Sequence, residues 1–184
     1  YYFQRNDHAK AWHHYERITE PPARYKKNPP AEHEFWTHMA WSAWRVEQFD
    51  KAYEFAKTAL TKSPCNVCYH QLYCVLGGVH EHREEWDEAL KHYEHAAVVG
   101  GPHAIWVSGK YAETILNHKR EWLDKGFPYI EKAIAANPSN AHNRVVYGKY
   151  FYYMSKDLQN AKKQFESALM IDPDFKWAQE WLGG

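Results

Sequence analysis

The sequence lacks the features that mark membrane proteins and nucleic-acid-binding proteins. No run of about 18 apolar residues occurs, so the sequence predicts no membrane span. Lysine plus arginine equals aspartate plus glutamate at 23 residues each, which gives a formal net charge of zero. Because a neutral chain without a basic stripe attracts phosphate backbones and anionic lipids weakly, we expect neither as the main partner.

Cysteine is scarce, with three residues in the whole chain. Cys65 and Cys68 form a Cys-x-x-Cys pair, with His70 and Cys74 nearby. A structural zinc site usually needs a second such pair, and haem attachment needs a histidine where Tyr69 stands. Buried or loop cysteines are the leading interpretation, followed by a local disulfide and then by a metal. We therefore predict that Cys65 and Cys68 hold no metal.

Catalytic motifs are also missing. The sequence contains no Gly-x-Ser-x-Gly, no phosphate-binding glycine loop and no His-Glu-x-x-His. Among its 13 histidines, His92 and His95 lie one helical turn apart, and His80 and His82 lie near an expected helix end. Neither pair has a third ligand at a fixed spacing, so surface or packing roles are preferred. We expect a non-enzymatic protein without cofactor or metal.

What the sequence does contain is a repeated pair of amphipathic segments. The second segment of each pair has a small residue in its first turn, with aromatic residues close behind: Ala11, Ala52, Ala89, Gly126 and Ala161. An amphipathic stretch such as FWTHMAWSAW precedes each internal one. This arrangement predicts that every repeat is a pair of helices.

The repeated residues follow a known pattern. Tyr73-x2-Leu76-Gly77 matches its first half and Ala89-x3-Tyr93 its second half. Further matches are Trp36-x2-Met39-Ala40, Tyr147-Gly148-x2-Phe151, Ala161-x3-Phe165 and the closing Pro64, Pro138 and Pro173. The chain resembles the tetratricopeptide repeat family, whose unit is about 34 residues long. The resemblance implies an all-α superhelix in which small residues let helices approach closely and each pair packs on the next.

The resemblance places the whole chain, 1–184, in one solenoid domain. The expected repeats are 32–64, 67–101, 103–138, 139–173, and 1–19 combined with 174–184 of a neighbouring copy. The third internal repeat departs most, because Gly126 and Pro128 open its second helix and HKREWLDK is expected to lengthen the turn. The proline-rich segment 20–30 is expected to be an extended connector, with a ligand for another domain as the alternative.

The two ends of the sequence match each other in phase. When residue 184 is continued into residue 1, Leu182-Gly183-x2-Tyr2 reproduces Leu-Gly-x2-Tyr, and Gly183 precedes Ala11 by twelve positions, as Ala40 precedes Ala52. A structural protein whose units continue head to tail into a superhelical filament would explain this match. The alternative is a piece of a longer adaptor that binds a partner. We expect an extracellular location for a filament and a cytoplasmic one for an adaptor.

The head-to-tail hypothesis predicts which residues meet. They are Tyr2, Ala11, Trp12, Tyr15, Trp177, Trp181, Leu182 and Gly183. Residues 174–184 are expected to form a helix or half of one. The aromatic faces of Trp12, Tyr15 and Trp177 are expected to find no partner within their own chain.

The adaptor hypothesis predicts a groove. In the family that the chain resembles, the first helices line a concave surface that receives a partner protein. The residues expected there are Trp41, Trp44, Arg45, Gln71, His82, Lys149, Tyr152 and Tyr153. The lysine and asparagine cluster that holds carboxyl-terminal peptides in some members is missing, since Thr37, Trp41, Cys74 and Gly78 stand on those faces. We therefore expect no selection of free carboxyl termini.

Overall fold

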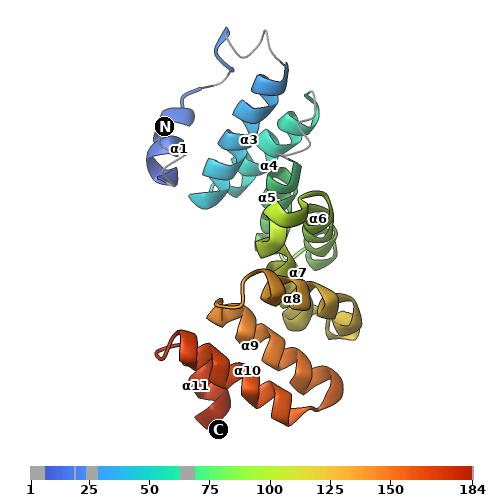
Figure 1. Ribbon diagram of the computed structural model, residues 1–184. Coiled ribbons are helices and arrows are strands. Elements are labelled where there is room, and N and C mark those ends of the chain that lie inside the picture. The colour runs from blue at the N-terminus through green and yellow to red at the C-terminus, as the bar shows by residue number, and fades with distance from the viewer. Residues whose placement is uncertain (1–6, 19, 24–28, 63–68, 184) are drawn as a thin grey trace. The chain divides into compact units, whose positions relative to one another are not determined.

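The computed structural model describes residues 7–18, 20–23, 29–62 and 69–183. These residues form helices joined by short connections, and none of them forms a strand (Figure 1). The chain divides into two compact units, residues 1–100 and residues 101–184. Each unit is built from helical hairpins, so the expected all-α repeat fold is confirmed. No helix in the described part is both long and apolar enough to cross a membrane.

The described residues of unit 1 form two complete helix pairs and one further helix. Its elements are α1 (His8–Tyr15), α3 (Pro29–Arg45), α4 (Phe49–Leu60), α5 (Tyr69–His82) and α6 (Trp86–Val99). Helix α3 pairs with α4 and α5 pairs with α6, while α5 also packs against both helices of the first pair. The core is fully buried at Met39, Ala52, Leu72 and Val79. Small and branched side chains thus let successive hairpins share one interior.

Unit 2 repeats this arrangement. Its elements are η2 (Gly101–Ala104), α7 (Ile105–His118), η3 (Arg120–Trp122), α8 (Leu123–Ala136), α9 (Ala141–Tyr150), η4 (Phe151–Ser155), α10 (Leu158–Ile171) and α11 (Lys176–Gly183). Helices α7 and α8 form one hairpin, α9 and α10 form the next, and α11 packs on α10. The expected helix at the carboxyl end is confirmed for residues 176–183.

Polar side chains fix where several helices begin. The carboxylate of Asp7 accepts a hydrogen bond from the Lys10 amide at 3.2 Å. Asn140 and Asp157 do the same for amides three residues on, each at 3.0 Å. Such caps satisfy amide groups that a helix start leaves unpaired and typically stabilise it by about 1 kcal/mol.

Three turns between paired helices share one backbone conformation. Glu47, Glu84 and Lys156 have φ values of 61°, 58° and 55°, in the left-handed region. Each lies five positions before the small residue of the second helix, at Ala52, Ala89 and Ala161. The residue after Glu47 and Glu84 donates its amide back to the carbonyl five positions earlier, at 2.9 Å. This closure satisfies carbonyls at the helix end.

The last helix pair accommodates one additional residue. Gly148 precedes Ala161 by thirteen positions, whereas Gly77 precedes Ala89 by twelve. The additional residue is taken up where α9 widens into the π-helical turn η4, Phe151–Ser155. A π turn is the usual way in which a helix absorbs a single insertion, and such turns often occur at functional sites.

The small residues of the repeat lie at close helix contacts, as expected. A Cβ atom on Gly77 would approach the Tyr93 ring to 2.6 Å, and one on Gly148 would approach the Phe165 ring to 2.5 Å. Both distances are shorter than non-bonded carbon atoms tolerate, so a larger residue would force the helices apart. The aromatic residue of one helix therefore fills the space that the glycine of its partner leaves free.

Three details of the connections differ from the expectation. Lys119 alone separates α7 from η3, so the segment HKREWLDK forms helical turns and does not lengthen a loop. Pro128 does not open the second helix of its repeat but lies inside α8, which begins at Leu123. The third difference concerns segment 20–30, because α3 already begins at Pro29. Proline is favourable in the first turn of a helix, where its missing amide hydrogen costs nothing.

Candidate interaction surfaces

A pair of half-buried tryptophans forms a surface on unit 1. The rings of Trp41 and Trp44 on α3 meet edge to face, with centroids 5.1 Å apart. The Arg45 guanidinium lies 6.0 Å from the Trp44 ring centre. Gly78 on α5 makes room, because a Cβ atom there would collide with the Trp44 indole. We call Trp41, Trp44 and Arg45 the tryptophan surface.

The other two residues predicted for the groove of unit 1 lie elsewhere on α5. His82 is exposed, and its ring stacks on Phe49 with centroids 3.8 Å apart. Phe49 is the first residue of α4, so His82 covers the turn between α3 and α4. Gln71 is half-buried near the start of α5. The structure thus brings Trp41, Trp44 and Arg45 together but gives His82 a packing role.

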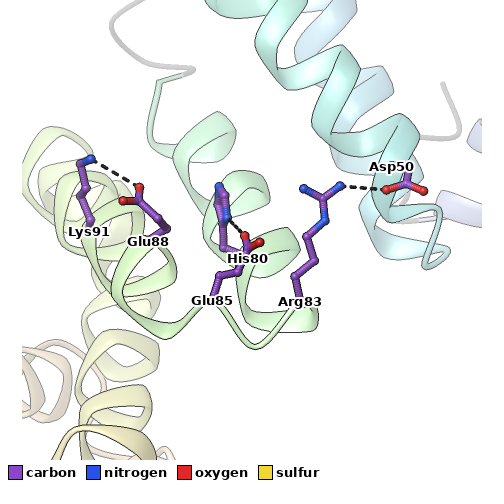
Figure 2. A network of polar contacts seen from close by, with 6 residues as sticks. All are labelled: Asp50, His80, Arg83, Glu85, Glu88 and Lys91. Carbon is purple, nitrogen blue, oxygen red and sulfur yellow. Dashed lines mark hydrogen bonds and ion pairs between the residues drawn. The ribbon is translucent and has the colours of Figure 1, made fainter.

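Separate polar pairs lie near the ends of α4, α5 and α6 in unit 1 (Figure 2). Arg83 at the end of α5 reaches Asp50 in α4, with nitrogen and oxygen 2.8 Å apart. His80 contacts Glu85 at 2.5 Å, and Lys91 contacts Glu88 at 3.4 Å. The Asp50 carboxylate is 93% exposed, so its ion pair contributes little to stability. The Arg83–Asp50 and His80–Glu85 pairs therefore support the helix ends, whereas Lys91–Glu88 lies within α6.

The histidines of unit 1 pack on one another and on tyrosine. The rings of His80 and His92 stack at 5.1 Å, and His95 lies 4.1 Å from Tyr73 between ring centres. Burial, aided by the nearby His80, lowers the pKa of His92 to about 4. Because a lowered pKa keeps the His92 ring neutral near pH 7, His92 can stack on His80 and serves packing here.

Within the described residues, no group of three histidine, cysteine or carboxylate side chains is placed to hold a metal ion. Cys65 and Cys68 lie outside those residues, so their state stays a prediction. Cys74 is fully buried, and burial raises the pKa of its thiol. A thiol that is both inaccessible and protonated is chemically inert.

Polar and aromatic side chains form a surface on unit 2, on α7, α9 and α11, which are the first helices of their repeats. Glu113 on α7 lies 3.1 Å from His142 on α9. Burial alone would raise the pKa of Glu113, but the hydrogen bond and charge of His142 lower it. The rings of His142 and Trp177 lie 5.3 Å apart, and the Lys149 ammonium lies 5.3 Å from Trp177. A shallow pocket of about 230 Å³ lies between His142 and Trp177.

Beside this surface, cations gather around three aromatic rings. Tyr152 and Tyr153 from η4 both meet Trp181 of α11, with ring centres 4.9 and 6.1 Å apart. Arg120, Lys149 and Lys156 each place a positive charge over one or two of these rings. We call this set the cation–aromatic cluster; it consists of Arg120, Lys149, Tyr152, Tyr153, Lys156 and Trp181.

The structure therefore brings together the three predicted groove residues of unit 2: Lys149, Tyr152 and Tyr153. Sequence reasoning missed Arg120 and Lys156. Arg120 belongs to the segment interpreted as a lengthened turn, and Lys156 to the inter-helix turn five positions before Ala161. The signal in the sequence was the spacing of thirteen positions between Gly148 and Ala161, one more than the twelve between Gly77 and Ala89. This additional residue marks the turn as a departure from the regular repeat.

Near the amino end, the described residues that were predicted to meet a neighbouring copy pack against other residues of their own chain. Trp12 is 9% exposed and packs on Phe55, with ring centres 6.3 Å apart, while Tyr15 meets Phe35 at 6.0 Å. The expectation that Trp12 and Tyr15 have no partner within the chain is wrong, because α1 turns its apolar face onto α3. Ala11 is buried on the same face, and Tyr2 lies outside the described residues.

At the carboxyl end, α11 remains more open. Trp177 contacts His142 and Phe175, so it too has partners, yet it stays 45% exposed. Trp181 packs on Phe165 with ring centres 5.2 Å apart. Leu182 is half-buried, and a Cβ atom on Gly183 would meet no atom within 4 Å. The α11 surface is thus open at Trp177 and Gly183.

Comparison with solved structures identifies the fold. The chain is similar to the carboxyl-terminal part of a TPR repeat-containing protein from Cytophaga hutchinsonii, at 17% identity and a TM-score of 0.71 over 98% of this chain and 66% of that one. It is similar to YrrB, a TPR protein with an unusual peptide-binding site, at 17% identity and a TM-score of 0.70 over 100% and 87%. It is also similar to MamA, at 17% identity and a TM-score of 0.68 over 94% and 92%.

These similarities hold for the fold and are too low in identity to transfer binding residues. No family model matches the sequence, and neither does any curated protein. The resemblance to the tetratricopeptide repeat, first read from the small and aromatic residues, is confirmed by the solved structures.

Proposed function

Because the chain has the fold of the tetratricopeptide repeat proteins, we propose that it is a non-enzymatic scaffold that binds another protein through the first helices of its repeats. The observation that carries this proposal is the partial exposure of large aromatic rings beside cations on these helices. Aromatic and arginine side chains are enriched at protein interfaces and supply many of the residues that contribute most to binding.

Similarity to YrrB supports a peptide or an exposed loop as the ligand, because that protein has a peptide-binding site. The tryptophan surface and the cation–aromatic cluster each have the size of a small recognition site. Neither reproduces the lysine and asparagine cluster that holds free carboxyl termini, so the ligand is an internal segment.

A peptide library displayed on phage tests this function. Immobilised protein should enrich a common motif, and the enriched peptides should bind in solution with micromolar affinity. Trp44→Ala or Lys149→Ala should weaken that binding at least about tenfold, a loss of roughly 1.4 kcal/mol. Lys132→Ala, on the exposed face of α8, is the matched control. Enrichment of no motif, or equal binding by all variants, would contradict the proposal.

Head-to-tail self-association is a second candidate, favoured by the open edge of α11 at Leu182 and Gly183. The packing of α1 adds a requirement, because α1 exposes Lys10, His13 and His14 outward. A neighbouring α11 must therefore bind this polar face or displace α1 from α3.

Light scattering and electron microscopy test this second candidate. The chain should form concentration-dependent linear assemblies, and Gly183→Trp should shorten them because the indole blocks close helix approach. Gly183→Ala adds only a methyl group and should shorten the assemblies less than Gly183→Trp does. A monomer at all concentrations, or assembly unaffected by Gly183→Trp, would leave the scaffold function alone.

A further inference from the structure

We infer that the cation–aromatic cluster of unit 2 binds an acidic segment of a partner protein, with carboxylates held by its three cations and one apolar side chain held in the adjoining pocket. This inference rests on the scaffold function and adds the chemistry of the partner and the place where it binds.

The cluster concentrates positive charge on a small area. The Arg120 guanidinium lies 4.1 Å from the centre of the Tyr153 ring. The Lys156 ammonium lies 5.3 Å from the Tyr152 ring and 6.0 Å from the Tyr153 ring. Lys149 adds a third charge 5.9 Å from Trp181. Three cations thus surround three rings that contact one another.

These charges are not neutralised within the described part of the chain. No carboxylate there forms an ion pair with Arg120, Lys149 or Lys156. The charges of Glu113 and Glu180 attract Lys149 without forming an ion pair with it, and the Glu113 carboxylate instead contacts His142. Burial together with the charge of Arg120 lowers the pKa of Lys149. An arriving carboxylate would relieve this repulsion, which makes the cluster complementary to anions.

The ring arrangement favours carboxylates over nucleic acid. Tyr152 and Tyr153 meet at an interplanar angle of 89°, and Tyr152 and Trp181 at 72°, so the rings pack edge to face. Each ring has a cation over its face, where a base would have to stack. A peptide carboxylate can bind these cations without stacking on a ring face.

An apolar pocket adjoins the cations. It has a volume of about 250 Å³ and shares Tyr152 and Trp181 with the cluster. Leu158, Phe165 and Leu182 supply further apolar lining, and Leu158 is 63% exposed. The space accommodates one large apolar side chain. An acidic segment with a leucine among its carboxylates would therefore satisfy both parts of the site.

The π turn explains why the site lies here. Both tyrosines belong to η4, the turn that absorbs the additional residue between Gly148 and Ala161. The same turn ends at Lys156, whose left-handed conformation closes it. A departure from the regular repeat therefore supplies three of the six residues of the cluster, as expected of an inserted residue kept for binding.

Fluorescence anisotropy tests the inference with a labelled peptide made of four Glu-Glu-Leu repeats and amidated at its carboxyl end. We expect saturable binding that weakens as salt is raised. Peptides with glutamine in place of glutamate, or serine in place of leucine, should bind at least about threefold more weakly. The double variant Arg120→Gln with Lys156→Gln should lose about tenfold in affinity.

Two controls distinguish the possible outcomes. Lys132→Gln removes an exposed lysine of α8 and should bind the acidic peptide normally, and circular dichroism confirms that the variants fold. Equal binding by the double variant, or tighter binding of an oligothymidylate than of the acidic peptide, would overturn the inference. If the phage library selects neutral peptides that depend on Trp44, the scaffold function stands and this inference fails. If no peptide binds at all, both fail.

Discussion

The hydroxyl group of Tyr150 occupies the position that a methyl group on Gly126 would need. Tyr150 is fully buried on α9 and donates a 2.7 Å hydrogen bond to the carbonyl of Ala112 on α7. Gly126 on α8 thereby lets a single tyrosine join three helices of unit 2. This contact explains why the third repeat has glycine where the other repeats have alanine.

Gly126→Ala should destabilise the protein despite the better helix propensity of alanine. The added methyl group must push the Tyr150 hydroxyl away from Ala112, which we expect to cost about 1–3 kcal/mol in the free energy of unfolding. Urea denaturation measures this loss.

Tyr150→Phe provides the control, because phenylalanine removes the clashing oxygen along with the hydrogen bond. The double variant should therefore be less destabilised than the sum of the two single variants, by about 0.5 kcal/mol or more. Strict additivity would show that the two residues do not interact.

Gly148 and Gly183 occupy the same position of the repeat pattern but should respond oppositely to alanine. Gly148→Ala inserts a methyl group against the Phe165 ring and should cost about 1–3 kcal/mol. Gly183→Ala meets no atom within 4 Å and should be neutral or stabilising by up to about 1 kcal/mol. Thermal unfolding of both variants measures the difference, and an equal response would contradict the close contact at Gly148.

Replacing the left-handed residue of an inter-helix turn should stabilise unit 1. Glu84 adopts a φ of 58°, which costs an ordinary side chain about 1 kcal/mol and glycine almost nothing. Glu84→Gly should therefore raise the free energy of unfolding by about 0.5–1 kcal/mol. Glu84→Ala keeps the Cβ atom and should bring no gain. A gain for both variants would point to the lost charge as the cause.

The stability of unit 1 should depend on the protonation of His92. Its pKa falls from 6.5 to about 4 on folding, so the unfolded chain binds the proton more readily. Stability is therefore fully present above pH 6.5 and declines as the pH falls toward 4. Allowing for partial exposure, we expect a loss of about 1 kcal/mol between pH 7 and pH 5.

Denaturation of His92→Phe at both pH values provides the comparison, because phenylalanine keeps the ring stacking but does not titrate. This variant should lose less stability at pH 5 than the original chain. Equal losses would show that His92 does not carry the pH dependence.

The sequence by itself determined the repeated helix pairs. Small residues such as Gly77 and aromatic residues such as Tyr93 recur at helical spacing, and this local pattern specifies which faces two neighbouring helices bury. The twelve positions between Ala40 and Ala52 leave room for only a short turn, and the structure contains one between Arg45 and Phe49. Such features depend on contacts close in sequence, so they can be read without knowledge of the tertiary structure.

Only the tertiary structure decided how the exceptions are accommodated. The additional residue before Ala161 is accommodated in a π turn, and the Arg120 guanidinium lies over the Tyr153 ring of that turn. Trp12 of α1 is buried because it packs against the apolar ring of Phe55 in the same unit. An isolated pattern cannot specify these outcomes, since they depend on which side chains of distant segments compete for the same buried surface.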